Sequence, residues 1–126
     1  MIKSNYIKDI LELILDSDEE GLFAKQQIPY LTEIEFDYTG SGLFVYFGHN
    51  TEIEKFKTAK PNLVLDGVKI KSDEHKIEGQ ATLFFKDGLI DNLEIWCYEG
   101  NYPKNDLTNY TLTQTWLNSE SKTIKK

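Results

Sequence analysis

Arginine is missing from this sequence altogether. Bidentate recognition of phosphate and carboxylate groups usually falls to arginine, so its absence counts against substrates such as nucleotides and acidic metabolites. Cys97 is the only cysteine and cannot form a disulfide within the chain, which favours a reducing compartment. No apolar run approaches the roughly 18–20 residues of a membrane span. The apolar stretch 7–15 is interrupted by charged residues and is followed by no small-residue cleavage site, so we expect a cytoplasmic protein.

Catalytic and metal-binding motifs are missing as well: there is no P-loop, GxGxxG, GxSxG or HExxH pattern. His49 and His75 fall in expected loops without metal-ligand spacing, and residues 73–75 read as a solvated turn rather than as a cation site. Cys97 lies within an expected strand, which favours a buried structural thiol, although the sequence leaves open a pairing with either histidine. We therefore predict no catalytic residue, no metal site and no cofactor.

Negative charge dominates, with 21 acidic residues against 14 lysines and a net charge of −7. The acids gather in three stretches without lysine: 9–20, 33–54 and 87–102. Residues 55–86, in contrast, contain seven lysines and four acids. Such a division creates a directional field that attracts a cationic partner and repels nucleic-acid phosphates and anionic membranes. We expect a basic protein as partner, and neither nucleic acid nor a membrane.

Helical periodicity is confined to the N-terminal part. Apolar residues at helical spacing predict a helix over 4–16 with Ser4 as its N-cap. Ser17 and Glu20 have the spacing of a capping box, which predicts a second short helix that ends near Pro29. The acids of its first turn then have a structural explanation, because negative charge is favourable there.

Beyond Pro29 the period of the pattern changes to two, which indicates strands. Glu33 and Glu35 fall on one face of the first strand, and alternating charge on a solvated face explains this pair without catalysis. Expected elements are a hairpin over 33–48, a helical turn within 51–59, a strand over 63–70 broken at Asp66–Gly67, a hairpin over 81–98 turning at 86–88, and a strand over 110–117.

Short connections between these strands favour antiparallel pairing. We expect an α+β fold in which one or two N-terminal helices pack on a curved, mainly antiparallel sheet of five to six strands. The sequence predicts one domain over 1–117 and a basic, flexible tail over 118–126.

Both faces of this sheet carry large hydrophobic residues. If Leu93, Ile95 and Cys97 face the helices, then Glu94, Trp96 and Tyr98 face the other way. Two short helices cannot cover both faces, so three explanations compete: segments 49–62 and 99–109 close the second face, the face forms a homodimer, or it docks another protein. For the docking hypothesis, the predicted contact centre is Glu94, Trp96, Tyr98, Glu99 and Tyr102, with Asp37, Tyr38, Asp18, Glu19 and Glu20 as an acidic rim.

Two segments, 93–103 (LEIWCYEGNYP) and 38–45 (YTGSGLFV), are similar to runs in small bacterial proteins. At the level of class, the chain resembles immunity proteins of polymorphic or contact-dependent-inhibition toxins. The resemblance covers about a third of the chain, and immunity proteins share a role rather than a diagnostic motif. It implies a cytosolic, acidic, single-domain binder that occludes a basic toxin such as a nuclease. No residue role follows from it.

The sequence thus predicts a non-catalytic protein that neutralises a basic partner protein, in the manner of an immunity protein, and that is a monomer or homodimer when free. The alternative is a small-ligand-binding or weakly catalytic α+β domain with a pocket between curled sheet and helix. A third hypothesis is a phosphate mimic that blocks a DNA-binding enzyme, but the acidic stretches are too scattered to form rows at phosphate spacing.

Overall fold

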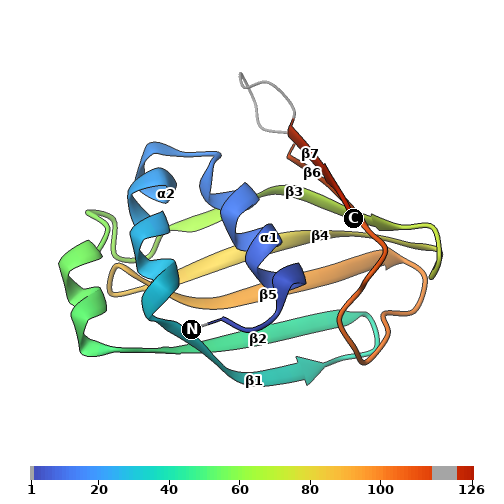
Figure 1. Ribbon diagram of the computed structural model, residues 1–126, viewed down its shortest axis with the longest axis horizontal. Coiled ribbons are helices and arrows are strands. Elements are labelled where there is room, and N and C mark those ends of the chain that lie inside the picture. Colours follow the sequence, from blue (N-terminus) through green and yellow to red (C-terminus); the bar gives the residue numbers. More distant parts are fainter. Residues whose placement is uncertain (1, 115–121) are drawn as a thin grey trace.

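The computed structural model describes residues 2–114 and 122–126, and within these ranges seven antiparallel strands form one curled, open sheet in the order β1-β2-β5-β4-β3-β6-β7 (Figure 1). The fold is therefore α+β, as predicted, with more strands than expected. In chain order the elements are α1 (Asn5–Leu15), α2 (Glu19–Ala24), the 3-10 helix η1 (Lys25–Tyr30), β1 (Leu31–Tyr38), β2 (Gly42–His49), the 3-10 helix η2 (Thr51–Phe56), β3 (Val64–Ser72), β4 (Ile77–Lys86), β5 (Leu89–Glu99), β6 (Thr111–Gln114) and β7 (Lys122–Lys125).

Helix α1 supplies one layer of the core. Ser4 caps it as predicted, because its hydroxyl accepts a hydrogen bond from the Ile7 amide at 3.1 Å. The apolar stripe of the helix packs on β3, β4 and β6. Ile7, Ile10 and Ile14 are fully buried there, so helical spacing in the sequence identified the core-facing side correctly.

Helix α2 begins one residue later than the sequence predicts. The Ser17 hydroxyl donates back to the Ile14 carbonyl at 2.6 Å, so it serves the end of α1 rather than the start of α2. Asp18 is the N-cap instead, and its carboxylate accepts from the Glu20 amide at 2.7 Å. The expected capping box between Ser17 and Glu20 is therefore wrong. The connection between the helices is so short that Ser17 still bonds to the last turn of α1.

Strand β1 contains a bulge between Glu33 and Glu35 that the alternation of the sequence conceals. Glu33 pairs with the buried Phe47 and accepts a hydrogen bond from the Lys3 amide at 2.6 Å, which places it on the helix-covered side. After the bulge, Glu35 pairs with the exposed Tyr46 on the opposite face. The expectation that Glu33 and Glu35 share a face is wrong, because one extra residue reverses the orientation of the following side chains.

Turn chemistry produces the predicted β4–β5 hairpin. Asp87 and Gly88 both have positive φ angles, 53° and 82°, as a two-residue type I′ turn requires. The predicted break in β3 is also present, as a register shift between Leu65 and Val68.

The C-terminal residues depart from the predicted flexible tail. Residues 122–125 form β7, which pairs with β6 and packs Ile124 against the core. The segment 122–125 contains only one apolar residue, Ile124, so the sequence gives only a weak indication of a strand here. Residues 115–121, which include the end of the expected strand over 110–117 and the start of the predicted tail, lie outside the described residues.

Candidate protein-binding surface

The two faces of the sheet differ in what covers them. Helices α1 and α2 lie together against one face, which we call the covered face (Figure 1). The other, the open face, carries the side chains that alternate with the core residues along each strand. Leu93, Ile95 and Cys97 on β5 are buried. Trp96, which lies between Ile95 and Cys97, is 47% exposed, and Tyr98, which follows Cys97, is 46% exposed. The predicted division of β5 into two faces is therefore correct.

The two long connections do not close the open face. In the first, η2 contacts η1, and Phe56 stacks on Tyr30 with ring centroids 5.8 Å apart. In the second, Tyr102 is buried against the α1 residue Tyr6, with hydroxyl oxygens 2.6 Å apart. Both segments therefore pack on the side of the helices, and the hypothesis that they cover the second face is wrong.

Aromatic side chains form the centre of the open face. Trp96 and Tyr98 contact each other with ring centroids 5.9 Å apart, and Phe44 and Tyr46 on β2 stack at 6.2 Å. Phe84 lies on the same face, because its cross-strand partner Asn92 also pairs with Tyr46. Phe44 and Phe84 are half-buried and the other three are exposed. We call these five residues the aromatic centre.

Charge is divided across the open face. Four carboxylates lie on the open face away from β3, and we call them the acidic flank: Glu35 and Asp37 on the edge strand β1, and Glu94 and Glu99 on β5, the strand that also carries Trp96 and Tyr98. On β3, at the far side of β4, lie Lys69 and Lys71, which we call the lysine flank. Both lysines are exposed. The field suggested by composition therefore has a defined direction, from β1 and β5 towards β3.

Tyr102 and Tyr38 correct the predicted contact centre. Tyr102 is only 5% exposed, and burial raises its pKa well above the usual tyrosine value. Tyr38 is half-buried on the covered face, where its ring stacks on Tyr102 at 6.4 Å. Neither residue belongs to the open face: Tyr38 pairs with the buried Leu43, and the chain after Gly100 (φ +88°) carries Tyr102 to the helix side.

The predicted acidic rim also separates in space. Asp37 lies on the open face, since it pairs with Phe44. Asp18, Glu19 and Glu20 lie at the start of α2, on the opposite side of the sheet. Asp18 caps that helix, and Glu19 and Glu20 lie in its first turn, so the predicted structural explanation applies to all three. The Glu20 carboxylate also accepts from the Ala59 amide at 3.0 Å.

Several open-face residues were not among the predicted site residues, and three of them show why. Phe44 and Tyr46 alternate with buried neighbours, so the period-two pattern could have identified them. Ile34 is 68% exposed and lies over Gly48, whose missing side chain makes room for it. Only the bulge places Ile34 there, and nothing local in the sequence signals it.

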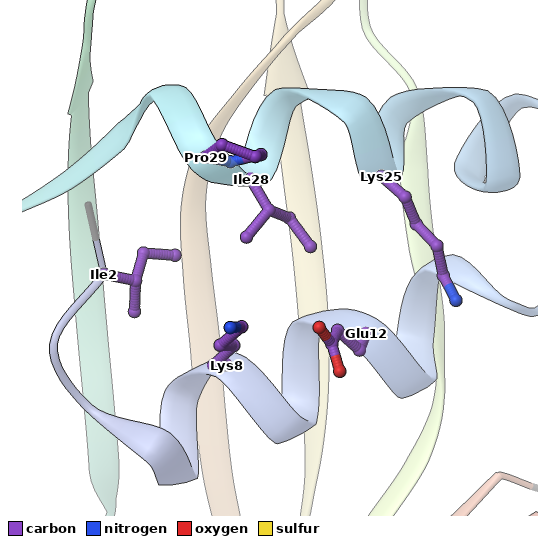
Figure 2. Close-up of a pocket in the computed structure, with 6 residues that line it drawn as sticks. All are labelled: Ile2, Lys8, Glu12, Lys25, Ile28 and Pro29. Carbon is purple, nitrogen blue, oxygen red and sulfur yellow. The ribbon is translucent and has the colours of Figure 1, made fainter.

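A groove on the helix side is the clearest small-molecule candidate (Figure 2). It has a volume of about 280 Å³ and lies between α1 and η1, where Lys8 and Glu12 face Ile28 and Pro29. Lys25 at its rim forms an ion pair with Asp16. The groove lacks an aromatic or buried polar lining, so it offers little to fix the orientation of a ligand.

The remaining candidates for chemistry are inert or isolated. Cys97 is buried, and burial raises the pKa of its thiol, which disfavours the nucleophilic thiolate. His49 and His75 are both exposed. Among residues 2–114 and 122–126, no three His, Cys, Asp or Glu side chains cluster as metal ligands would.

Comparison with known proteins found no match of any of three kinds. No protein-family model, curated protein or solved structure matches this chain. Within the described ranges, every helix is too short or too polar to cross a bilayer. The open face is therefore the feature from which a function can be inferred.

Proposed function

We propose that this protein is a non-catalytic binder that docks a basic protein through its open face. The observation that carries the proposal is the pairing of an exposed aromatic centre with the acidic flank on one uncovered sheet surface. Exposed aromatic groups of this kind are the usual anchors of protein interfaces, and peripheral charges mainly govern the rate of encounter.

Charge complementarity favours a basic occupant. The chain has a net charge of −7, and its open-face carboxylates project beside Trp96 and Tyr98 rather than away from them. A cationic partner would be steered to this side, with on-rates raised by about 10–1000-fold at low ionic strength. Lysine or arginine side chains of the partner could then stack on the exposed rings while they pair with Glu94 and Glu99.

The partner we propose is a toxin domain, so that the protein acts as an immunity protein in a bacterial cytoplasm. A nuclease-like toxin must attract phosphate and therefore has a basic cleft. An acidic surface with aromatic anchors suits occlusion of such a cleft. The class-level resemblance of the chain to immunity proteins points the same way.

The test is capture of partners from a lysate of the organism that carries the gene, at low and high salt, with matched variants. Trp96→Ala removes an anchor from the open face, and Phe23→Ala removes a ring of similar exposure, 44% against 47%, from the helix side. We expect one basic protein to be retained by the wild type and by Phe23→Ala but lost from Trp96→Ala, and to be weakened by salt.

Once identified, the captured protein should inhibit growth when expressed alone, and co-expression of the wild-type chain should relieve that inhibition. Relief by wild type but not by Trp96→Ala supports neutralisation through the open face. Equal capture by Trp96→Ala, or a captured protein without basic surface, would refute the proposed mode of binding.

A further inference from the structure

Strand β4 divides the open face into two halves that are chemically complementary at the same level along the strands. Gln80 on β4 lies between Trp96 on β5 and Lys69 on β3. Two residues further along β4, on the same face, Glu78 lies between Glu99 and Lys71. At both levels, an aromatic or acidic residue on one side of β4 matches a lysine on the other.

This arrangement is self-complementary under one two-fold rotation. An axis parallel to β4, just above the open face, places β5 of one copy over β3 of the other and keeps residues at their own level along the strands. Lys69 of the second copy then meets the Trp96 ring, and Lys71 of the second copy meets Glu99. A two-fold axis perpendicular to the strands would instead bring acidic flank against acidic flank.

The contacts are within reach of the side chains involved. Two sheets that pack face to face lie about 10 Å apart, a gap that the aromatic rings and the aliphatic stems of lysines can fill. An ammonium group over an indole ring is attracted by about 0.5–1 kcal/mol at an exposed site, and more when water is excluded. The two-fold symmetry makes each of these contacts twice.

We propose that the free protein forms a two-fold dimer in which the two open faces pack together across β4. Each chain carries a net charge of −7, but this repulsion is screened beyond about 8 Å at physiological salt, whereas the close contacts are not. The dimer is weak because only one carboxylate of each acidic flank, Glu99, meets a lysine, and because Glu78, which lies on the axis, faces Glu78 of the second copy. A basic partner brings more positive charge and displaces the second copy. The displacement rests on the proposed function, while the dimer does not.

Sedimentation equilibrium at protein concentrations from about 10 μM to 1 mM in about 0.15 M salt tests the dimer. The 14.6 kDa chain should show concentration-dependent doubling of its mass. Two charge variants should each remain monomeric: Lys69→Glu/Lys71→Glu, the all-acidic variant, has acids on both sides of β4, and Glu94→Lys/Glu99→Lys has lysines on both sides of it. Mixed in equal amounts, they should associate, because each flank of one variant then meets an opposite flank of the other.

Lys8→Glu/Lys55→Glu is the matched control. It changes the net charge as much as the all-acidic variant does, but at exposed positions on α1 and η2, on the side of the helices. We expect this control to dimerise like the wild type. A wild-type chain that stays monomeric throughout, a mixture that does not associate, or a control that dissociates as fully as Lys69→Glu/Lys71→Glu would overturn the proposal.

The outcomes separate the two proposals. A monomeric wild type that still captures a basic protein through Trp96 rejects the dimer and retains the proposed function. A dimer that captures no basic protein supports the two-fold contact and rejects both the displacement and the proposed function.

Discussion

Gln27 offers the sharpest test of how this fold is held together. It is fully buried in η1, and its side chain makes three hydrogen bonds to two other segments. The amide nitrogen donates to the carbonyls of Phe56 at 2.8 Å and Gly88 at 3.0 Å, and the amide oxygen accepts from the Ile90 amide at 2.8 Å. One side chain therefore ties η1 to η2 and to the β4–β5 hairpin.

Replacing Gln27 with leucine keeps a similar volume but removes all three hydrogen bonds. The Gly88 carbonyl still accepts from the Thr58 amide at 3.0 Å, so the groups that lose these bonds are the Ile90 N–H and the Phe56 carbonyl. An unsatisfied buried group costs about 1–3 kcal/mol, and burial of the leucine side chain offsets part of this. We expect Gln27→Leu to lower the free energy of unfolding by about 2–4 kcal/mol.

Urea unfolding followed by far-UV circular dichroism measures this change, provided that the slope with denaturant stays constant. Gln26→Leu is the matched control, because Gln26 is the exposed neighbour of Gln27, and its effect should stay within about 0.5 kcal/mol. If the two variants unfold at the same urea concentration, the reasoning about Gln27 is refuted and its hydrogen bonds add no net stability.

Four further outcomes are expected. Trp96→Ala should weaken binding of the basic partner by about 2 kcal/mol or more while the chain stays folded, measured by calorimetry and circular dichroism; an unfolded variant would place Trp96 in the core. Glu99→Lys should mainly slow association in stopped-flow mixing, and an unchanged on-rate would remove Glu99 from the steering surface. Cys97 should react with a thiol reagent at least about a hundredfold faster in urea than in the native protein, because its thiol is buried and its pKa is raised; equal rates would contradict that burial. Burial raises the pKa of Tyr6 and Tyr102 above the value in the unfolded chain, so tyrosinate forms first in the unfolded chain as the pH rises. Their contribution to stability should therefore be constant below about pH 10 and be lost above it. A urea midpoint that does not fall between about pH 8 and 11 would contradict this.

Local patterns in the sequence were sufficient for most elements. The Ser4 cap, the helical stripe of α1, the Asp87–Gly88 turn and the break in β3 all follow from interactions between residues a few positions apart. These preferences depend on the local backbone, so they can be predicted from a short segment without knowledge of the rest of the chain.

Errors arose where a side chain's orientation depended on a distant contact. The bulge after Glu33 reversed the faces of β1, and the reversal of the chain after Gly100 carried Tyr102 to the helix side, where it meets Tyr6. Neither event has a local signature, since alternation of residue types looks the same on either side of a bulge.

The sequence by itself determined most element types, the excess of acids and the orientation of Trp96 and Tyr98 away from the core-facing residues of β5, because alternation along a single strand separates its two faces. Only the tertiary structure decided that Glu35 and Asp37 join these rings on one surface while Glu20 and Tyr102 do not. It also decided that Lys69 and Lys71 lie across β4 at the levels of Trp96 and Glu99. The order and register of strands set these neighbours, and both result from packing of the whole sheet against α1 rather than from any one segment.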